Sequence, residues 1–174
     1  MTIHPPTLFL GFASTVVPFC FAAAGLFKKD YTGWIRPAIP WAFFGVMALG
    51  TGILMGGAWA YEALGFGGFW AWDPVENASL MPWLVATALL HSLSTTEKRG
   101  VFKSWTVLLA IAAFSLSLLG TFIVRSGIIV SVHAFASDPN RGMFILAFLA
   151  IVVGGGLSLY ALRVSQVKSE GRYK

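Results

Sequence analysis

Three histidines and one aromatic segment are the parts of this chain best suited to chemistry. The segment runs from Gly67 to Trp83 and reads GGFWAWDPVENASLMPW, so that seventeen residues contain three tryptophans and two acids. Indole rings offer flat, polarisable surfaces, and the Asp-Pro pair favours a turn. Neutral imidazole is a common ligand of transition metals. These residue types predict a site for a flat ligand, with histidines available to a metal.

The composition places this site in a membrane protein. Of the 174 residues, 57% are hydrophobic and only 11% are charged, which leaves too little polar surface to cover a water-soluble globule. Helices that cross a hydrocarbon core of ~30 Å need about 20 residues at ~1.5 Å each. We therefore predict an all-α integral membrane protein, a single membrane domain over residues 1–174 with about five transmembrane helices. The expected spans are residues 5–27, 38–61, 78–95, 102–124 and 142–162.

The distribution of charge predicts the orientation of these spans. Ten of the 12 Lys and Arg residues fall before the second span, between the third and fourth, and after the fifth, while Arg125 and Arg141 fall on the other side. Basic loops remain on the cytoplasmic side, or on the matrix side in mitochondria. The N-terminus and the aromatic segment are therefore expected outside a bacterial or mitochondrial inner membrane. The net charge of +5 reflects topology and does not indicate nucleic-acid binding.

Local signals within the aromatic segment predict how it is shaped. Asp73 is followed by Pro74 and Glu76, which is the chemistry of a capping box with Asp in place of Ser. A helix is therefore expected to begin at Pro74 and to lead into the third span. Trp70 and Trp72 would project to one face on a strand, whereas on a tight turn they would wall a cleft.

Two histidines are predicted to lie on the same outer side. His4 precedes the first span, and His133 lies in the connection SVHAFASDP. Two neutral imidazoles on opposite faces of a macrocycle are one way in which haem iron is held. The pair is a candidate clamp for haem over the tryptophan surface, with Arg125 placed to pair with the propionates. The alternatives are ordinary interfacial residues: histidines and tryptophans as anchors, and Arg125 as a snorkelling side chain.

His91 lies inside the third expected span, in PWLVATALLHS. Trp83, Thr87 and His91 recur every fourth residue and are expected on one helix face. An ionisable residue within a membrane indicates function, although a packed histidine bonded to a neighbouring hydroxyl is an equal alternative. No other span contains histidine, so His91 is either a lone ligand or has a partner in another polypeptide.

The motifs together resemble a known family. GGFWAWDP resembles the WWD signature of the membrane haem-handling proteins of cytochrome c biogenesis. The runs HPPTLFLGF, DPVENASLMPW, ALLHSLSTTEKRG, SWTVLLAIAAFSLSLLGTFIVRSG and SVHAFASDP resemble the cytochrome c maturation protein F family. The resemblance extends over nearly the whole chain, and its WWD segment covers residues 65–83.

The resemblance implies the core of a haem lyase that takes haem from a periplasmic haem chaperone. Trp70, Trp72 and Asp73 match the WWD segment, and His4 and His133 match the two outer histidines that ligate the haem in transit. His91 matches one of two membrane histidines that ligate a separate, stable b-type haem. The implied product is haem joined by thioethers to the CxxCH cysteines of an apocytochrome c.

The chain also departs from this family. Usual members are several times longer, and the second membrane histidine is missing here. Phe66 and Phe69 stand where the family usually has tryptophan. We therefore expect a portion of a larger protein or a split subunit that works with other lyase subunits. Two other functions stay open: a WWD-type haem exporter that delivers haem to the chaperone without catalysing attachment, and a structural subunit whose aromatic residues are membrane anchors.

Overall fold

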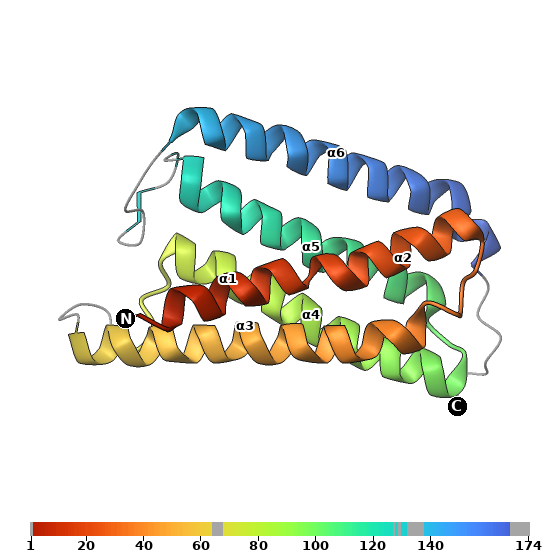
Figure 1. The fold of residues 1–174 in the computed structure, drawn as a ribbon, viewed down its shortest axis with the longest axis horizontal. Helices are drawn as coiled ribbons and strands as arrows, with labels where there is room; N and C mark the ends of the chain where they lie inside the picture. Colours follow the sequence, from red (N-terminus) through yellow and green to blue (C-terminus); the bar gives the residue numbers. More distant parts are fainter. Residues whose placement is uncertain (1, 64–67, 127, 129, 132–137, 168–174) are drawn as a thin grey trace.

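The computed structural model describes residues 2–63, 68–126, 128, 130, 131 and 138–167, and within them it is helical without β-strands (Figure 1). This confirms the predicted all-α class. The elements are α1 (His4–Ser14), α2 (Val16–Lys28), α3 (Ile35–Ala63), α4 (Pro74–Arg99), α5 (Lys103–Ser126), α6 (Pro139–Arg163) and the 3-10 helix η1 (Val164–Gln166).

The helices lie side by side in an elongated bundle (Figure 1). α3 packs against α1 on one side and α4 on another, and α5 packs against both α4 and α6. The starts of α1, α4 and α6 lie at the same end of the bundle as the ends of α3 and α5. At the opposite end, α2, α4 and α6 each finish with basic residues in their last turn. The fold therefore gathers the first histidine and the aromatic segment at one end, away from the basic helix ends.

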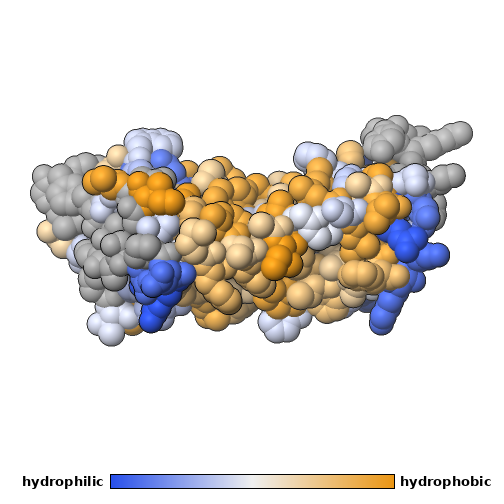
Figure 2. Space-filling view, turned by 90° about the horizontal axis from the view of Figure 1, so that it is seen from above, coloured by the Kyte–Doolittle hydropathy of each residue, from blue (hydrophilic) through white to orange (hydrophobic). Residues whose placement is uncertain are grey.

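Four stretches of this bundle are long and apolar enough to cross a membrane: His4–Lys28, Ile35–Ala63, Lys103–Ser126 and Asn140–Gln166. Figure 2 shows hydrophobic residues in a continuous band along the middle of the molecule, with hydrophilic residues at both ends. The third expected span falls on α4, which has 26 residues but is not among the four. Polar side chains such as Thr87 and Ser92 reduce its hydropathy, and α4 lies against α3 and α5. Membrane insertion of α4 therefore stays a prediction.

The first expected span is broken into two helices at Thr15. Pro18 explains the break, because proline has no N–H to donate to the carbonyl of Ser14 and its ring crowds that carbonyl. The hydroxyl of Thr15 lies 2.7 Å from the carbonyl of Phe12, to which it donates, and its oxygen lies 3.1 Å from Ser117 Oγ of α5. Both Ser14 and Thr15 are buried. The break is thus anchored to α5 by a buried hydroxyl pair.

Glycines allow α1 and α3 to approach backbone to backbone. A Cβ atom on Gly11 would lie 2.6 Å from Leu49 Cα, and one on Gly52 would lie 2.9 Å from Leu8 Cα. Real Cβ atoms essentially never come closer than 3.0 Å to such atoms. Only glycine is accommodated at these two positions, and the approach brings the start of α1 directly against α3.

Candidate functional site

The start of α4 fixes the aromatic segment in place. Asp73 Oδ2 accepts a hydrogen bond from the backbone N–H of Val75 at 3.0 Å, and Glu76 Oε2 accepts from the N–H of Asp73 at 3.2 Å. This reciprocal arrangement is the predicted capping box, with Pro74 as the first helical residue. Glu76 Oε2 also accepts from the N–H of Ala71 at 2.9 Å. The two carboxylates therefore hold the turn between the tryptophans and α4.

Replacing Asp73 by Ala is expected to lower the free energy of unfolding by about 1 kcal/mol, because loss of an N-cap acceptor costs about that much. The substitution also removes the acceptor of a hydrogen bond from the Ser131 hydroxyl, which donates to Asp73 Oδ2 at 2.6 Å. Thermal unfolding in detergent measures the change. Asp73→Asn is the matched control, since its side-chain oxygen still caps the helix. Equal stability of the Ala variant and the unaltered protein would contradict the assignment.

The two tryptophans before Asp73 point in different directions. Trp72 has a left-handed backbone with φ of 57°, and its carbonyl accepts a hydrogen bond from the Asn77 side chain at 3.0 Å. The rings of Trp70 and Trp72 meet edge to face, with centroids 6.3 Å apart. Trp72 is 71% exposed, whereas Trp70 is half-buried. The segment is therefore a turn, with one ring turned inward and one left at the surface.

His4 is held against α3 by one ring nitrogen. Its Nδ1 lies 2.7 Å from the carbonyl oxygen of Gly52. A carbonyl only accepts, so Nδ1 carries the proton and donates, and Nε2 keeps a lone pair. The ring also lies over Gly56, where a Cβ atom would come 2.6 Å from His4 Cε1. Histidines that ligate metals are typically oriented in this way by a carbonyl on the other nitrogen.

His4 lies at the junction of two hollows. A small cavity of about 50 Å³ is lined by His4, Trp70, Glu76 and Ser79 among others. A wider cleft of about 270 Å³ extends from His4 past apolar side chains to Arg125 at the end of α5. Most of the cleft surface is apolar, which suits a flat, largely apolar ligand. The structure thus brings together His4, Trp70 and Arg125 from α1, the aromatic segment and α5.

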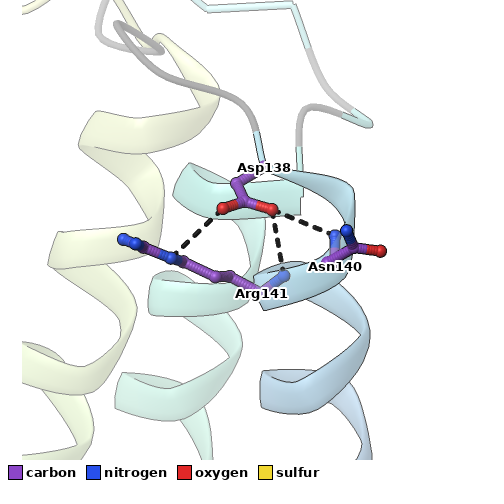
Figure 3. Close-up of polar contacts among 3 residues, drawn as sticks. All are labelled: Asp138, Asn140 and Arg141. Carbon is purple, nitrogen blue, oxygen red and sulfur yellow. Dashed lines mark hydrogen bonds and ion pairs between the residues drawn. The ribbon is translucent and has the colours of Figure 1, made fainter.

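The guanidinium of Arg125 forms no ion pair within the described part of the chain. Arg141, by contrast, pairs with Asp138, whose Oδ2 lies 3.1 Å from Arg141 Nε (Figure 3). Asp138 also caps α6, accepting from the N–H groups of Asn140 at 3.1 Å and Arg141 at 3.2 Å. Its own N–H donates to the carbonyl of Arg125 at 3.0 Å. Of these two arginines, only Arg125 offers its charge to the cleft.

His91 lies apart from this site, on the exposed side of α4. Its neighbour Ser92 is buried and shares a hydrogen bond of 2.6 Å with Thr106 of α5. The imidazole of His91 bonds to none of the described residues, so the structure does not show the neighbouring hydroxyl expected for a packed histidine. Trp83 instead faces α3, donating to the carbonyl of Val46 at 3.1 Å. Two steps of four residues turn by about 80°, which is within one broad helix face, so a face shared by Trp83 and His91 stays a prediction.

Other predicted features lie outside the described residues. These are His133, and therefore the geometry of the His4–His133 pair, together with Phe66. Gly52 and Gly56, which seat the His4 imidazole, were missed from the sequence. Their signal is the set of closely spaced glycines in the second span: Gly45, Gly50, Gly52, Gly56 and Gly57. Ser131, which bonds to Asp73, had no comparable signal.

Comparisons with known proteins match nearly the whole chain. Residues 1–130 match the family described as cytochrome C assembly protein. The chain is 63% identical to the cytochrome c-type biogenesis protein CcmF of Pseudomonas aeruginosa, over 98% of this chain and 26% of that protein. It is 59% identical to the protein of the same name from Haemophilus influenzae, over 97% of this chain and 26% of that one.

A solved structure is similar as well. It is titled cytochrome c heme lyase CcmF and superposes with a TM-score of 0.79 and 36% sequence identity, over 92% of this chain and 25% of that chain. The chain described here therefore spans about a quarter of the length of the relatives it matches.

Proposed function

This chain belongs to the cytochrome c assembly family, within it to the CcmF proteins, and on that premise we propose that it forms part of a haem lyase. In this role it receives haem from a haem chaperone and positions it for thioether attachment to the CxxCH cysteines of an apocytochrome c. The observation that carries the proposal is His4, with Nδ1 bound to the Gly52 carbonyl and Nε2 available beside an apolar cleft.

The described side chains fit haem in three respects. The Nε2 lone pair of His4 is a suitable axial ligand, with His133 proposed as the ligand on the other face. The apolar walls of the cleft suit the macrocycle, and the Arg125 guanidinium suits the propionates. Trp70 and Trp72 add aromatic surface, and Asp73 holds them in position through the cap of α4. The set combines a metal ligand, an apolar wall and a cation.

The chain's contribution to attachment is positioning. Haem supplies the vinyl groups, and the cytochrome supplies the thiols. In each addition the thiol S–H bond and the vinyl π bond break, the sulfur bonds to one vinyl carbon, and the other vinyl carbon takes the hydrogen that the thiol loses. What the residues of this chain do is hold the iron at His4 and keep the ring oriented, which increases the chance of productive encounter.

Arg125→Gln is expected to weaken haem binding by ~1 kcal/mol, about five-fold in Kd, because an exposed charge pair is worth about that much. The Kd of the unaltered protein for haem should rise with salt concentration, and this rise should be smaller in the variant. Haem titration followed in the Soret band measures both. Arg141→Gln is the matched control, since Arg141 pairs with Asp138. Equal weakening in both variants would indicate a general charge effect and count against propionate pairing.

We further propose that His91 ligates a stable b-type haem whose second ligand lies outside this chain. Its exposed imidazole, which bonds to no described residue, is available for this. His91→Ala should convert a six-coordinate, low-spin spectrum into that of a five-coordinate haem, with little change at the outer site. Absorption and electron paramagnetic resonance spectra of the purified complex measure this. An unchanged low-spin signal would remove His91 from the ligand set.

The alternative function is a haem exporter that loads the chaperone. The two differ in what accumulates when this chain is removed from cells. A lyase component leaves haem-loaded chaperone in place while apocytochrome stays unmodified. An exporter leaves the chaperone empty. Haem staining of both proteins after gel electrophoresis separates the outcomes, and a purely structural subunit predicts no haem band in the complex at all.

This function requires a particular orientation in the membrane. The end of the bundle with His4 and Trp70 is proposed to face the periplasm or the intermembrane space, because the basic helix ends lie at the opposite end. The membrane is then the inner membrane of a bacterium or mitochondrion. The proposed partners are the haem chaperone, the apocytochrome and the remaining segments or subunits of the lyase.

A further inference from the structure

A buried hydrogen-bond donor lies beside His4. Trp70 Nε1 is buried and has no acceptor among the described residues. Leaving a buried N–H unsatisfied costs about 1–3 kcal/mol, and native proteins satisfy most such groups. Trp70 lines the same small cavity as His4. The cavity is therefore where an acceptor for this indole is to be sought.

The other polar groups around this cavity are acceptors. His4 Nε2 has a lone pair, because Nδ1 is the nitrogen that donates to Gly52. Glu76 uses Oε2 for two backbone N–H groups, whereas its Oε1 bonds to no described residue. The Ser79 hydroxyl donates to the Glu76 carbonyl at 2.7 Å and keeps its lone pairs. One donor and several acceptors thus surround about 50 Å³ of space.

We propose that this cavity binds an ordered water molecule that links Trp70 to His4. The water accepts a hydrogen bond from Trp70 Nε1–H, and its two hydrogens are donated to His4 Nε2 and to the Glu76 carboxylate. A water needs ~10–15 Å³ of such space and two to four polar partners, and the cavity offers both. Water fits because it both accepts and donates.

Other occupants match the cavity less well. An apolar ligand leaves the Trp70 N–H unsatisfied. An anion accepts from Trp70 but cannot donate to His4 Nε2, and it would lie beside the Glu76 carboxylate. A cation is attracted by the Glu76 carboxylate but cannot accept a hydrogen bond from the indole N–H. Water is the ligand whose chemistry agrees with every polar group that lines the space.

The bridge makes Trp70 a positioning residue for His4. While water donates to Nε2, the imidazole is held at both nitrogens, by Gly52 on one side and by the water on the other. A metal that binds Nε2 displaces this donation, so the hydrogen bond at Trp70 changes when the metal arrives. This coupling to iron rests on the proposed function, whereas the water site itself does not.

Ultraviolet resonance Raman spectroscopy tests the water site, because one indole band reports the hydrogen bond of the N–H group. The haem-free full-length protein in lipid nanodiscs is compared with Trp70→Phe, and the difference isolates Trp70. We expect a hydrogen-bonded band that moves to the free-indole position in Val75→Phe, where the much larger side chain occupies the cavity that Val75 lines. Trp72→Phe is the control for signals from the exposed ring.

Two results would overturn the water site. One is a Trp70 band already at the free-indole position in the unaltered protein. The other is a hydrogen-bonded band that persists in Val75→Phe, which would show that the acceptor is a protein group.

Adding haem then tests the coupling. The Trp70 band should shift with haem in the unaltered protein and stay constant in His4→Ala. A hydrogen-bonded band whose position is the same with and without bound haem would refute the coupling but would not contradict the water site. Failure of haem to bind at all would refute both the proposed function and the coupling, again without touching the water result.

Discussion

Replacing His4 by Ala should reduce the affinity for haem at the outer site by more than about 100-fold. Loss of a group that merely orients a metal ligand typically costs 10–100-fold, and here the ligand itself is removed. Cytochrome c maturation should fall in parallel, because the ring is no longer held beside the cleft. Soret titration and haem staining of the product cytochrome measure the two effects. His91→Ala, at the other proposed haem site, should retain the outer-site affinity.

Exogenous imidazole distinguishes a lost ligand from a damaged fold. The alanine variant leaves space for imidazole against the Gly52 carbonyl, so millimolar imidazole should restore part of the Soret band. A variant with unchanged haem affinity would refute His4 as a ligand. A variant with weak binding that imidazole leaves unimproved would assign His4 a packing role against α3.

Gly11→Val should destabilise the helix bundle by about 3 kcal/mol. The added Cβ would lie 2.6 Å from Leu49 Cα, an atom of the backbone that cannot turn aside. Overpacking of this kind typically costs 1–3 kcal/mol, and the two further methyl groups of valine place it at the upper end. Denaturant unfolding in mixed micelles measures the loss. Haem affinity should also fall, because moving α1 breaks the contact between His4 and Gly52.

Gly154→Val is the matched control, since it makes the same substitution within a long helix. No described atom lies within 4 Å of a Cβ placed there. Removing a helical glycine reduces the conformational freedom of the unfolded chain, so the stability should stay level or rise slightly. Equal destabilisation at both positions would mean that valine itself, rather than the α1–α3 contact, is responsible.

Much of the helical framework was predictable because its signals are local. Runs of apolar residues predicted the membrane-spanning helices, and the Asp73–Pro74–Glu76 spacing predicted the start of α4 together with its capping box. These features depend on neighbours in sequence. The break at Thr15 is also encoded locally, by Pro18, although the apolar run alone predicts one unbroken span over residues 5–27.

The site was harder to predict because its contacts join distant parts of the chain. His4 is a candidate ligand from sequence, but Gly52, whose carbonyl binds its Nδ1, lies 48 residues away in the chain. That hydrogen bond depends on how α1 packs against α3. The spacing of Trp83 and His91 predicts a common face, but only the packing decides that Trp83 is half-buried against α3 while His91 is exposed. The shared cleft of His4 and Arg125 likewise depends on packing, as it joins α1 to α5.

The break at Thr15 divides the first span into two helices that pack against different neighbours. α1 rests mainly on α3, whereas α2 contacts α3, α5 and α6. The contacts of the span change at Thr15, whose hydroxyl oxygen lies 3.1 Å from Ser117 Oγ of α5. The two halves of the span therefore have different neighbours, and the position of His4 depends on α3 more than on the rest of the bundle.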